Sequence, residues 1–351
     1  MLEGALLIQK VAVIGAGSWG TALASVLAMN GHQVILWVRN PQTAEEINNT
    51  HRNEKYLPEI TLPENIVATS DIQEAVAGMR IVLLAVPSHS MRDMCKKLAA
   101  HLEPDVLLLH ATKGFELESL KRMSEVISEE VSPGIAARLA VLTGPSHAEE
   151  VVLQQPTTVV VASASEESML RAQDLLMNPN FRVYTNPDLV GAEIAGALKN
   201  IIALGAGMSD GLGYGDNAKA ALMTRGLAEI SRLGSKLGAM PLTFLGLAGV
   251  GDMIATCTSK HSRNWRAGYM LGQGNKLEDV LEQMGMVVEG VRTTHATHAL
   301  AQREQVEMPI TSVLYGILFE GKTAKQGVEE LMGRGKTYEM GLLNPDADRP
   351  E

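Results

Sequence analysis

The chain has 351 residues, 46% of them hydrophobic and 20% charged, which is the composition of a globular protein long enough for two domains. Its formal net charge of −10 argues against partners with dense negative charge, so we expect no nucleic-acid partner and no binding to a membrane surface. The two cysteines, Cys95 and Cys257, are far apart and lack metal-ligand spacing. We therefore expect reduced thiols, no metal site and a cytoplasmic location.

Residues 1–9 do not have the pattern of a targeting segment. An acidic residue, Glu3, stands where a secretion signal would be basic, and the apolar run is too short to cross a bilayer. Glycine, lysine or aspartate interrupts every later apolar run. We therefore expect a soluble protein that begins with a flexible extension.

The segment from Lys10 to Asn30 predicts a strand, a glycine turn and a helix. In its GAGSWG sequence, Gly15 permits a tight turn, Gly17 lets the backbone approach a pyrophosphate, and Gly20 lets the helix pack closely on the strand. The start of the helix then offers free N–H groups and a positive dipole end to an anion. This context favours a dinucleotide site over a turn that serves packing alone.

A second strand, Gln33 to Val38, completes the first βαβ unit. NAD-selective sheets usually carry an acidic residue at the end of this strand, whereas here Arg39 follows. Arg39 would suit the extra phosphate of NADP, although an exposed loop arginine is the alternative. Residues 40–63 are polar and interrupted by prolines, which predicts a helix and a loop in which Tyr56 is a lid residue or a packed aromatic.

Three continuous apolar runs, residues 80–87, 105–112 and 139–143, are typical of a parallel sheet buried on both faces. Ligands of such sheets bind at the carboxyl ends of the strands, so the residues that follow these runs should line one crevice with the glycine turn. They are Pro87, Ser88, His89, Thr112, Lys113, Gly114, Gly144, Pro145 and Ser146. Runs at residues 157–163 and 181–185, with a helix over 165–177 between them, extend the sheet.

Beyond Pro187 the β-type runs stop and helical periods separated by glycines dominate. We therefore predict an α/β fold in which a Rossmann-type dinucleotide-binding domain, residues 10–188, precedes an all-α substrate domain, residues 189–341. Residues 342–351 should form a frayed tail.

Asp188 to Met208 is apolar almost all round, which predicts a buried helix. Its small residues, such as Gly196, would let other elements approach closely. Lys199 lies on this helix, and burial would lower its pKa toward the range useful for proton transfer. A lysine that extends to the surface, or that pairs with a structural carboxylate, is the alternative.

Leu245 to Gly268 concentrates glycines, hydroxyl groups and cations, which is typical of an anion site; a solvated polar loop with Arg263 on the surface is the alternative. Thr256, Ser262, Arg263 and Asn264 offer donors that suit the oxygens of a phosphate monoester. Asp252 is a candidate partner for the ammonium group of Lys199.

With these segments assembled, the sequence resembles the bacterial NAD(P)-dependent glycerol-3-phosphate dehydrogenases from Lys10 to about Met340. The segments that carry the resemblance are GAGSWG, THRNEKYLP, ATKGFE, LTGPSHAEEV, GALKNIIALGAGMSDGLGYGDNAKAALMTRGLAE, GDMIATCTSKHSRNWRAG and VVEGVRT. It implies reversible hydride transfer between NADP or NAD and a phosphorylated triose, dihydroxyacetone phosphate, in glycerophospholipid synthesis.

The resemblance also implies roles for individual residues. Lys199 would transfer the proton, with Lys113 and Asp252 beside it. The substrate site would comprise Lys113, Gly144, Ser146, Lys199, Asn200, Asp252, Thr256, Ser262, Arg263 and Asn264. The dinucleotide would contact Gly15, Gly17, Ser18, Trp19, Gly20, Arg39, Tyr56, Lys113, Ala148, Arg263, Val287 and Glu289.

Two positions depart from the family pattern. His147 stands where phenylalanine is common, and Trp265 where a basic residue is frequent. Trp19 as a core aromatic remains an alternative, as do two other functions: a related two-domain hydroxy-acid dehydrogenase and a non-catalytic NAD(P)-sensing protein. A homodimer is expected from the prevalence of twofold oligomers.

Overall fold

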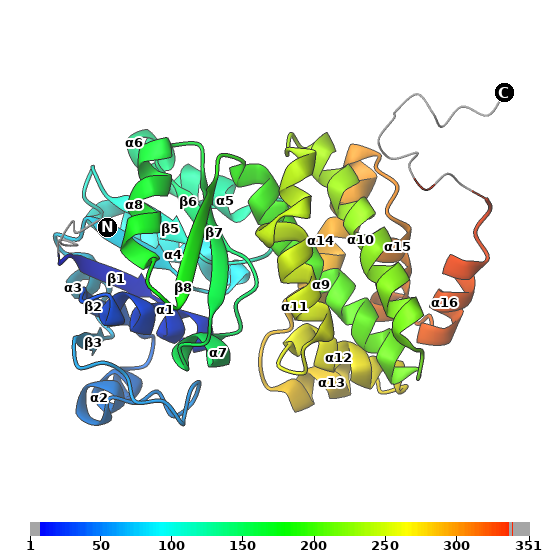
Figure 1. Ribbon diagram of the computed structural model, residues 1–351, viewed down its shortest axis with the longest axis horizontal. Coiled ribbons are helices and arrows are strands. Elements are labelled where there is room, and N and C mark those ends of the chain that lie inside the picture. The colour runs from blue at the N-terminus through cyan, green and yellow to red at the C-terminus, as the bar shows by residue number, and fades with distance from the viewer. Residues whose placement is uncertain (1–7, 337–338, 340–351) are drawn as a thin grey trace.

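The computed structural model describes residues 8–336 and 339, which form a sheet-containing region and a helical region side by side (Figure 1). The predicted combination of a Rossmann-type domain and an all-α domain is confirmed. Most of the predicted extension, and the whole of the predicted tail at 342–351, lie outside the described residues.

The first region is built on an eight-stranded sheet in the order β3-β2-β1-β4-β5-β6-β7-β8. Neighbouring strands are parallel except β6 and β7, which are antiparallel. The strands are β1 (Lys10–Ile14), β2 (Gln33–Trp37), β3 (Ile66–Thr69), β4 (Ile81–Leu84), β5 (Leu107–His110), β6 (Ala140–Thr143), β7 (Thr157–Ser163) and β8 (Phe181–Asn186).

Helices cover both faces of this sheet, which explains why its central strands are continuous apolar runs. One face packs against α1 (Ser18–Met29), α2 (Pro41–Thr50), α7 (Ala148–Val152) and α8 (Glu166–Leu176). The other packs against α3 (Ile72–Val76), α4 (Met91–Leu98), α5 (Met123–Glu130) and α6 (Pro133–Ala136). Two short 3₁₀ turns, η1 (Ser88–Ser90) and η2 (Ala99–His101), flank α4.

Two features of the sheet were not predicted. Strand β3 has only four residues and exposes Val67 at the edge, so it has too little apolar periodicity to stand out. Strand β7 runs antiparallel to β6 because α7 has only five residues and does not carry the chain back to the amino ends of the strands.

The second region is organised around α9 (Leu189–Gly211), which lies among the other helices in Figure 1. The predicted buried helix is confirmed and ends three residues later than expected. Helix α9 crosses α12 (Arg263–Gly272) closely at Gly207 of α9 and Gly268 of α12. A Cβ atom on either glycine would lie within about 2 Å of a carbonyl oxygen of the other helix. The surrounding elements are α10 (Asp216–Lys236), η3 (Pro241–Leu245), η4 (Leu247–Gly251), α11 (Asp252–Thr258), α12 (Arg263–Gly272), α13 (Leu277–Met284), α14 (Glu289–Glu304), α15 (Pro309–Phe319) and α16 (Ala324–Met332).

Helix α9 also joins the two regions. Phe115, Val141 and Val160 of the sheet region share one apolar core with it. Within the described part of the chain, α9 alone is long and apolar enough to cross a membrane, and 89% of that apolar stretch is buried inside the protein. A core helix has this degree of burial.

Candidate active site

The glycine turn after β1 has the close packing that its sequence predicts. Gly15 has a φ of +114°, and a Cβ atom there would lie 2.7 Å from the carbonyl oxygen of Ala85. A Cβ atom on Gly20 would lie 1.8 Å from the carbonyl oxygen of Gly15. Around Gly17, in contrast, no atom lies within 4 Å of such a position. The turn is therefore closed toward the sheet and open at Gly17, which fits the approach of a pyrophosphate.

A polar loop lies against this turn. Asn53 is fully buried and donates from Nδ2 to the carbonyl oxygen of Ala16 at 3.0 Å and to Thr21 Oγ1 at 2.9 Å. Ser18 Oγ donates to the carbonyl oxygen of Tyr56 at 3.4 Å. The sequence did not single out Asn53, because its partners are more than 30 residues away.

Trp19 and Tyr56, both predicted to contact the dinucleotide, are half-buried. Trp19 packs against the apolar core of the sheet, as the alternative for it proposed. Tyr56 stands beside the ammonium group of Lys55, which lies 5.3 Å from its ring centre.

Arg39, His89 and Arg292 lie close together where β2 and β4 end. Arg39 follows β2 and is exposed. Burial lowers the pKa of His89 below its ordinary value, and the nearby charges of Arg292 and Arg39 lower it further. The cluster combines two residues of the sheet region with one from the first turn of α14.

Lys199 is buried in α9, with 6% of the residue exposed, and so does not extend to the surface. Its Nζ donates to Asp252 Oδ1 and to Thr256 Oγ1, each at 2.5 Å. The predicted partnership of Lys199 with Asp252 is thus confirmed. Lys113 Nζ donates to the other carboxylate oxygen, Oδ2, at 2.6 Å. Asp252 therefore bridges two lysines, one from each region.

This arrangement sets the charge of both groups. Burial lowers the pKa of Lys199 to about 8; attraction to Asp252 opposes that effect, and repulsion from Lys113 adds to it. Burial alone would raise the pKa of Asp252, but the two lysines outweigh burial and hold that pKa below its ordinary value. The site thus contains an ionised carboxylate and a lysine that titrates near neutral pH.

Lys113, Asp252 and Lys199 together are called the lysine centre below. The predicted phosphate donors lie beside it. Asn264 Nδ2 donates to Asn200 Oδ1 at 2.9 Å, and Asn264 Oδ1 accepts from the backbone N–H of Gly290 at 2.8 Å. The amide N–H groups of Asn200 therefore point away from Asn264. Ser262 caps α12 by accepting from Trp265 N at 3.2 Å, and Arg263 begins that helix with an exposed side chain. Thr256 donates its hydroxyl proton to the carbonyl oxygen of Asp252 at 2.7 Å, so it supports the lysine centre.

The end of β6 contributes backbone groups to the same place. Gly144 has a φ of +122°, and its carbonyl oxygen lies 3.4 Å from Lys113 Nζ and accepts from Ser146 Oγ at 3.0 Å. His147 Nε2 lies 3.2 Å from the carbonyl oxygen of Ala255 in α11, so it bridges the two regions. Ala148 is buried at the first position of α7.

The two regions are also joined through Glu289, the first residue of α14. Ser88 Oγ, after β4, donates to Glu289 Oε2 at 3.1 Å. Burial raises the pKa of this carboxyl, while Ser88, Arg292 and Arg263 oppose the rise. Val287, two residues earlier, is half-buried. Arg263, Glu289 and Ser88 are therefore neighbours although they come from three separate segments.

Trp265, the second departure from the family pattern, is turned toward the end of α9. Its Nε1 donates to Asp210 Oδ2 at 2.7 Å, and its ring stacks on Tyr269 with centres 5.2 Å apart. This aromatic side chain therefore packs within the helical region.

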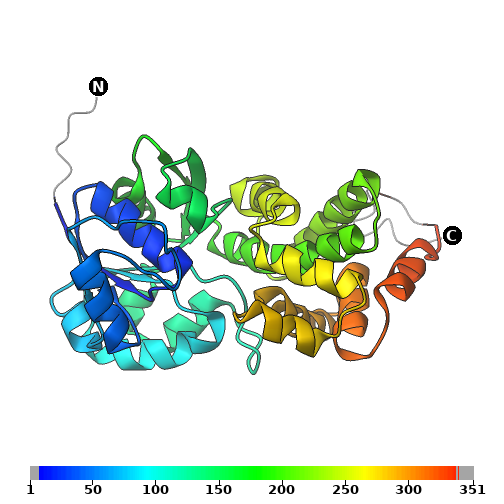
Figure 2. The same ribbon diagram turned by 90° about the horizontal axis from the view of Figure 1, so that it is seen from below.

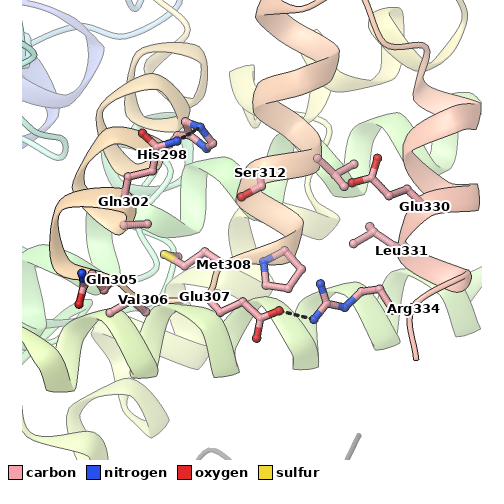
Figure 3. A pocket seen from close by; sticks show the side chains of 13 residues that line it. His298, Gln302, Gln305, Val306, Glu307, Met308, Ser312, Glu330, Leu331 and Arg334 are labelled. Carbon is pink, nitrogen blue, oxygen red and sulfur yellow. Dashed lines mark hydrogen bonds and ion pairs between the residues drawn. The ribbon is translucent and has the colours of Figure 1, made fainter. Parts of the chain in front are cut away.

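A cavity of about 420 Å³ lies elsewhere, between α14, α15 and α16 (Figure 3). The Glu307–Arg334 ion pair spans part of it at 2.5 Å, and none of the predicted site residues lines it. In residues 8–336, no three histidine, cysteine, aspartate or glutamate side chains form a group that would hold a metal ion. The convergent polar groups join side chains of the sheet region to side chains of the helical region. Figure 2 shows these two regions side by side from below.

Comparisons with known proteins show which family the chain belongs to. A family model described as NAD-dependent glycerol-3-phosphate dehydrogenase N-terminus matches residues 10–169, and one described as its C-terminus matches residues 188–329. Glycerol-3-phosphate dehydrogenase (NAD(P)+) of Oceanobacillus iheyensis is 59% identical over 333 residues, which is 95% of this chain and 96% of the relative. The enzyme of Geobacillus thermodenitrificans is 58% identical over 344 residues, 97% of this chain and 100% of the relative.

A solved structure shows the same architecture. The crystal structure of glycerol-3-phosphate dehydrogenase from Coxiella burnetii has a TM-score of 0.89 and 38% sequence identity, and the match covers 93% of this chain and 99% of that one. With both halves of the chain matched by family models and nearly its whole length by close relatives, the protein belongs to the NAD-dependent glycerol-3-phosphate dehydrogenase family.

Proposed function

We propose that this protein interconverts dihydroxyacetone phosphate and sn-glycerol 3-phosphate, with NADPH or NADH as the hydride donor. The observation that carries the proposal is the buried Lys199, held by Asp252 opposite the edge of the sheet that bears the glycine turn. Membership of the family supplies the substrate pair and the cofactor class.

The charges of the site suit reduction of a ketone. When bound, the reduced nicotinamide supplies the hydride to the carbonyl carbon. The carbonyl oxygen then gains negative charge, which the ammonium group of Lys199 stabilises and to which it donates a proton. In the reverse direction, neutral Lys199 accepts the hydroxyl proton. Asp252 orients Nζ in both states because it is already ionised.

The remaining polar groups divide between the two ligands. Asn200, Ser262, Arg263 and Asn264 would hold the phosphate monoester of the triose, with Thr256 supporting Lys199. Lys113, Gly144 and Ser146 would lie where the substrate meets the cofactor. The dinucleotide would lie along the glycine turn and extend to Ser18, Trp19, Arg39, Tyr56, Ala148, Val287 and Glu289.

This assignment includes several broader proposals. Residues 10–188 would form the dinucleotide-binding domain and residues 189–341 the substrate domain. The exposed Arg39 would give NADP an additional ionic contact. We further propose a cytoplasmic homodimer that feeds glycerophospholipid synthesis and that binds neither nucleic acid nor membrane.

The decisive experiment measures oxidation of NADPH and, separately, of NADH by the purified protein with dihydroxyacetone phosphate. Lys199→Ala is the control: its kcat should fall by about 10³-fold or more while its dissociation constant for the cofactor stays within about twofold, because Lys199 acts only on the substrate. A variant that turns over normally would show that another group donates the proton.

Two outcomes would favour the other functions. Efficient reduction of an unphosphorylated 2-keto acid, without competition by inorganic phosphate, would indicate a hydroxy-acid dehydrogenase. Tight cofactor binding with no hydride transfer to any phosphorylated triose would indicate a sensing protein. The buried Lys113–Asp252–Lys199 arrangement favours catalysis over sensing, since cofactor binding alone does not require it.

A further inference from the structure

Besides Asp252 on α11, the helical region has a buried carboxylate on α9: Glu193, six residues before Lys199. Glu193 is 8% exposed and belongs to the helical region, yet every polar partner that the structure gives it comes from the sheet region. Its Oε1 accepts from Ser124 N at 2.7 Å, and its Oε2 accepts from Ser124 Oγ and from Arg122 Nη1, each at 2.5 Å. His110 Nε2 lies 3.2 Å from Oε1. The carboxylate therefore ties the two regions together.

The contact between Glu193 and the sheet region lies close to the lysine centre along both β5 and α9. His110 is the last residue of β5, and Lys113 follows three residues later. On α9, Gly196 lies midway between Glu193 and Lys199, and a Cβ atom on Gly196 would lie 3.6 Å from Cγ of Lys113. The stem of Lys113 thus passes beside the helix segment that connects the two side chains. About 9 Å of helix separates Glu193 from Lys199. A shift of β5 against α9 would therefore move Lys113 relative to Lys199.

We infer that Glu193 is a positioning residue, which fixes Lys113 relative to Lys199 across Asp252 by holding the end of β5 against α9. The inference rests on the proposed function, because it concerns the groups assigned to that reaction. The lysine centre is sensitive to such a shift, since the two ammonium groups bind opposite oxygens of one carboxylate, at 2.6 Å and 2.5 Å.

The charges around both sites determine the expected effect. Burial alone would raise the pKa of Glu193, but His110, Arg122 and Ser124 outweigh it, so the pKa is lowered and Glu193 is ionised. Arg122 also contacts Glu125 at 3.3 Å. Around Lys199, the charged or titratable neighbours are Asp252 and Cys257 on α11 and Lys113 after β5.

Glu193→Gln disrupts this contact while keeping the size of the side chain. One amide position still accepts from Ser124 N, but the N–H₂ group at the other would face two donors, Ser124 Oγ and Arg122. Lys113 would then move away from Asp252. Lys199 would lose a neighbouring positive charge and keep Asp252 to itself, so its pKa would rise.

The experiment measures kcat for dihydroxyacetone phosphate reduction against pH, with saturating NADPH and substrate, together with the thermal midpoint. In the wild type, kcat should decline at high pH, which gives the profile an alkaline limb, because the ammonium form of Lys199 donates the proton and is lost as Lys199 deprotonates. In Glu193→Gln, kcat should fall at least about tenfold, and the alkaline limb should move up by about half a pH unit.

The matched control is Glu229→Gln, a second buried glutamate of the helical region. Glu229 accepts from the backbone N–H groups of Ile310 and Thr311 and has no contact with the sheet region in the described part of the chain. Its replacement should leave the alkaline limb in place. If Glu193→Gln does not fold, Arg122→Gln provides the same test from the other partner, with a smaller shift in the same direction.

A lowered kcat with an unmoved alkaline limb would show that Glu193 serves stability alone and would overturn the inference. So would wild-type behaviour in folded Glu193→Gln, or an equal shift in Glu229→Gln. A wild type without turnover would instead refute the proposed function, and the inference with it.

Discussion

The two regions that meet at the candidate site present opposite kinds of surface. On the sheet side, the features proposed to face the cofactor are the open position at Gly17 and the exposed Arg39. On the helical side, Lys199, Asp252 and Asn264 are all buried and bonded to one another or to neighbouring side chains. Recognition of a large anionic cofactor uses exposed donors, whereas proton transfer uses a buried group whose pKa its neighbours control.

This difference implies that the helical side is the more sensitive to removal of one charge. Asp252→Asn would leave Lys113 and Lys199 without the carboxylate between them. We expect kcat to fall about 10³-fold, and the pKa of Lys199 to fall further, because the main negative charge that supports its ammonium form is lost. The measurement is kcat against pH in the direction of ketone reduction.

Asp210→Asn is a suitable control for that variant, since Asp210 binds Lys219 at 2.8 Å near the other end of α9. Its kcat should stay within about threefold of the wild type. If both variants lost activity equally, any acidic side chain on this helical core would matter, and the special role of Asp252 would be refuted.

The sheet side should respond through binding and not through chemistry. In Gly20→Ala, the new Cβ atom would overlap the carbonyl oxygen of Gly15, so the turn must shift away from the helix. We expect the dissociation constant for NADPH to rise about 10²-fold, with kcat at saturating cofactor within a few-fold of the wild type, and stability to fall by about 1–3 kcal/mol. Isothermal titration and thermal unfolding measure the two effects.

Gly134→Ala provides the comparison, because a Cβ atom there meets no atom within 4 Å. It should leave the affinity for NADPH unchanged. A large loss of kcat at saturating NADPH in Gly20→Ala would mean that the turn also positions the reacting groups, and the division between the two sides would fail.

The same division explains what the sequence alone revealed. The glycine turn is contiguous, and its motif spans six residues that follow a strand and open a helix, so Gly15, Gly17 and Gly20 could be assigned from the sequence. The composition of α9 predicts a buried helix, but it leaves open whether Lys199 extends to the surface. The short strand β3 and the reversed β7 were missed, since they depend on edge pairing and on the path of one short helix.

The contacts of the buried charges were harder to predict. Asp252 was paired with Lys199, but its second bond, to Lys113, joins residues 139 positions apart in the sequence. Glu193 stood out only as a polar residue in an apolar helix, and its partners lie about 70 positions earlier. Asn53 has no distinctive neighbours in sequence either. Each of these pairings is set by the docking of separate segments, which one sequence does not specify.

The smallest expected effect concerns Arg39, and it tests how the exposed side selects its cofactor. Arg39 is solvent-exposed at the end of β2, so its contact with an added phosphate would be screened by water and salt. Arg39→Ala should raise the KM for NADPH about tenfold and leave that for NADH within about twofold. Arg80→Ala, near the opposite end of the sheet and 3.7 Å from Asp105, should change neither value. Equal losses with both cofactors would show that Arg39 contacts a group that NADPH and NADH share, and selectivity would then have to come from the other members of that cluster, His89 and Arg292.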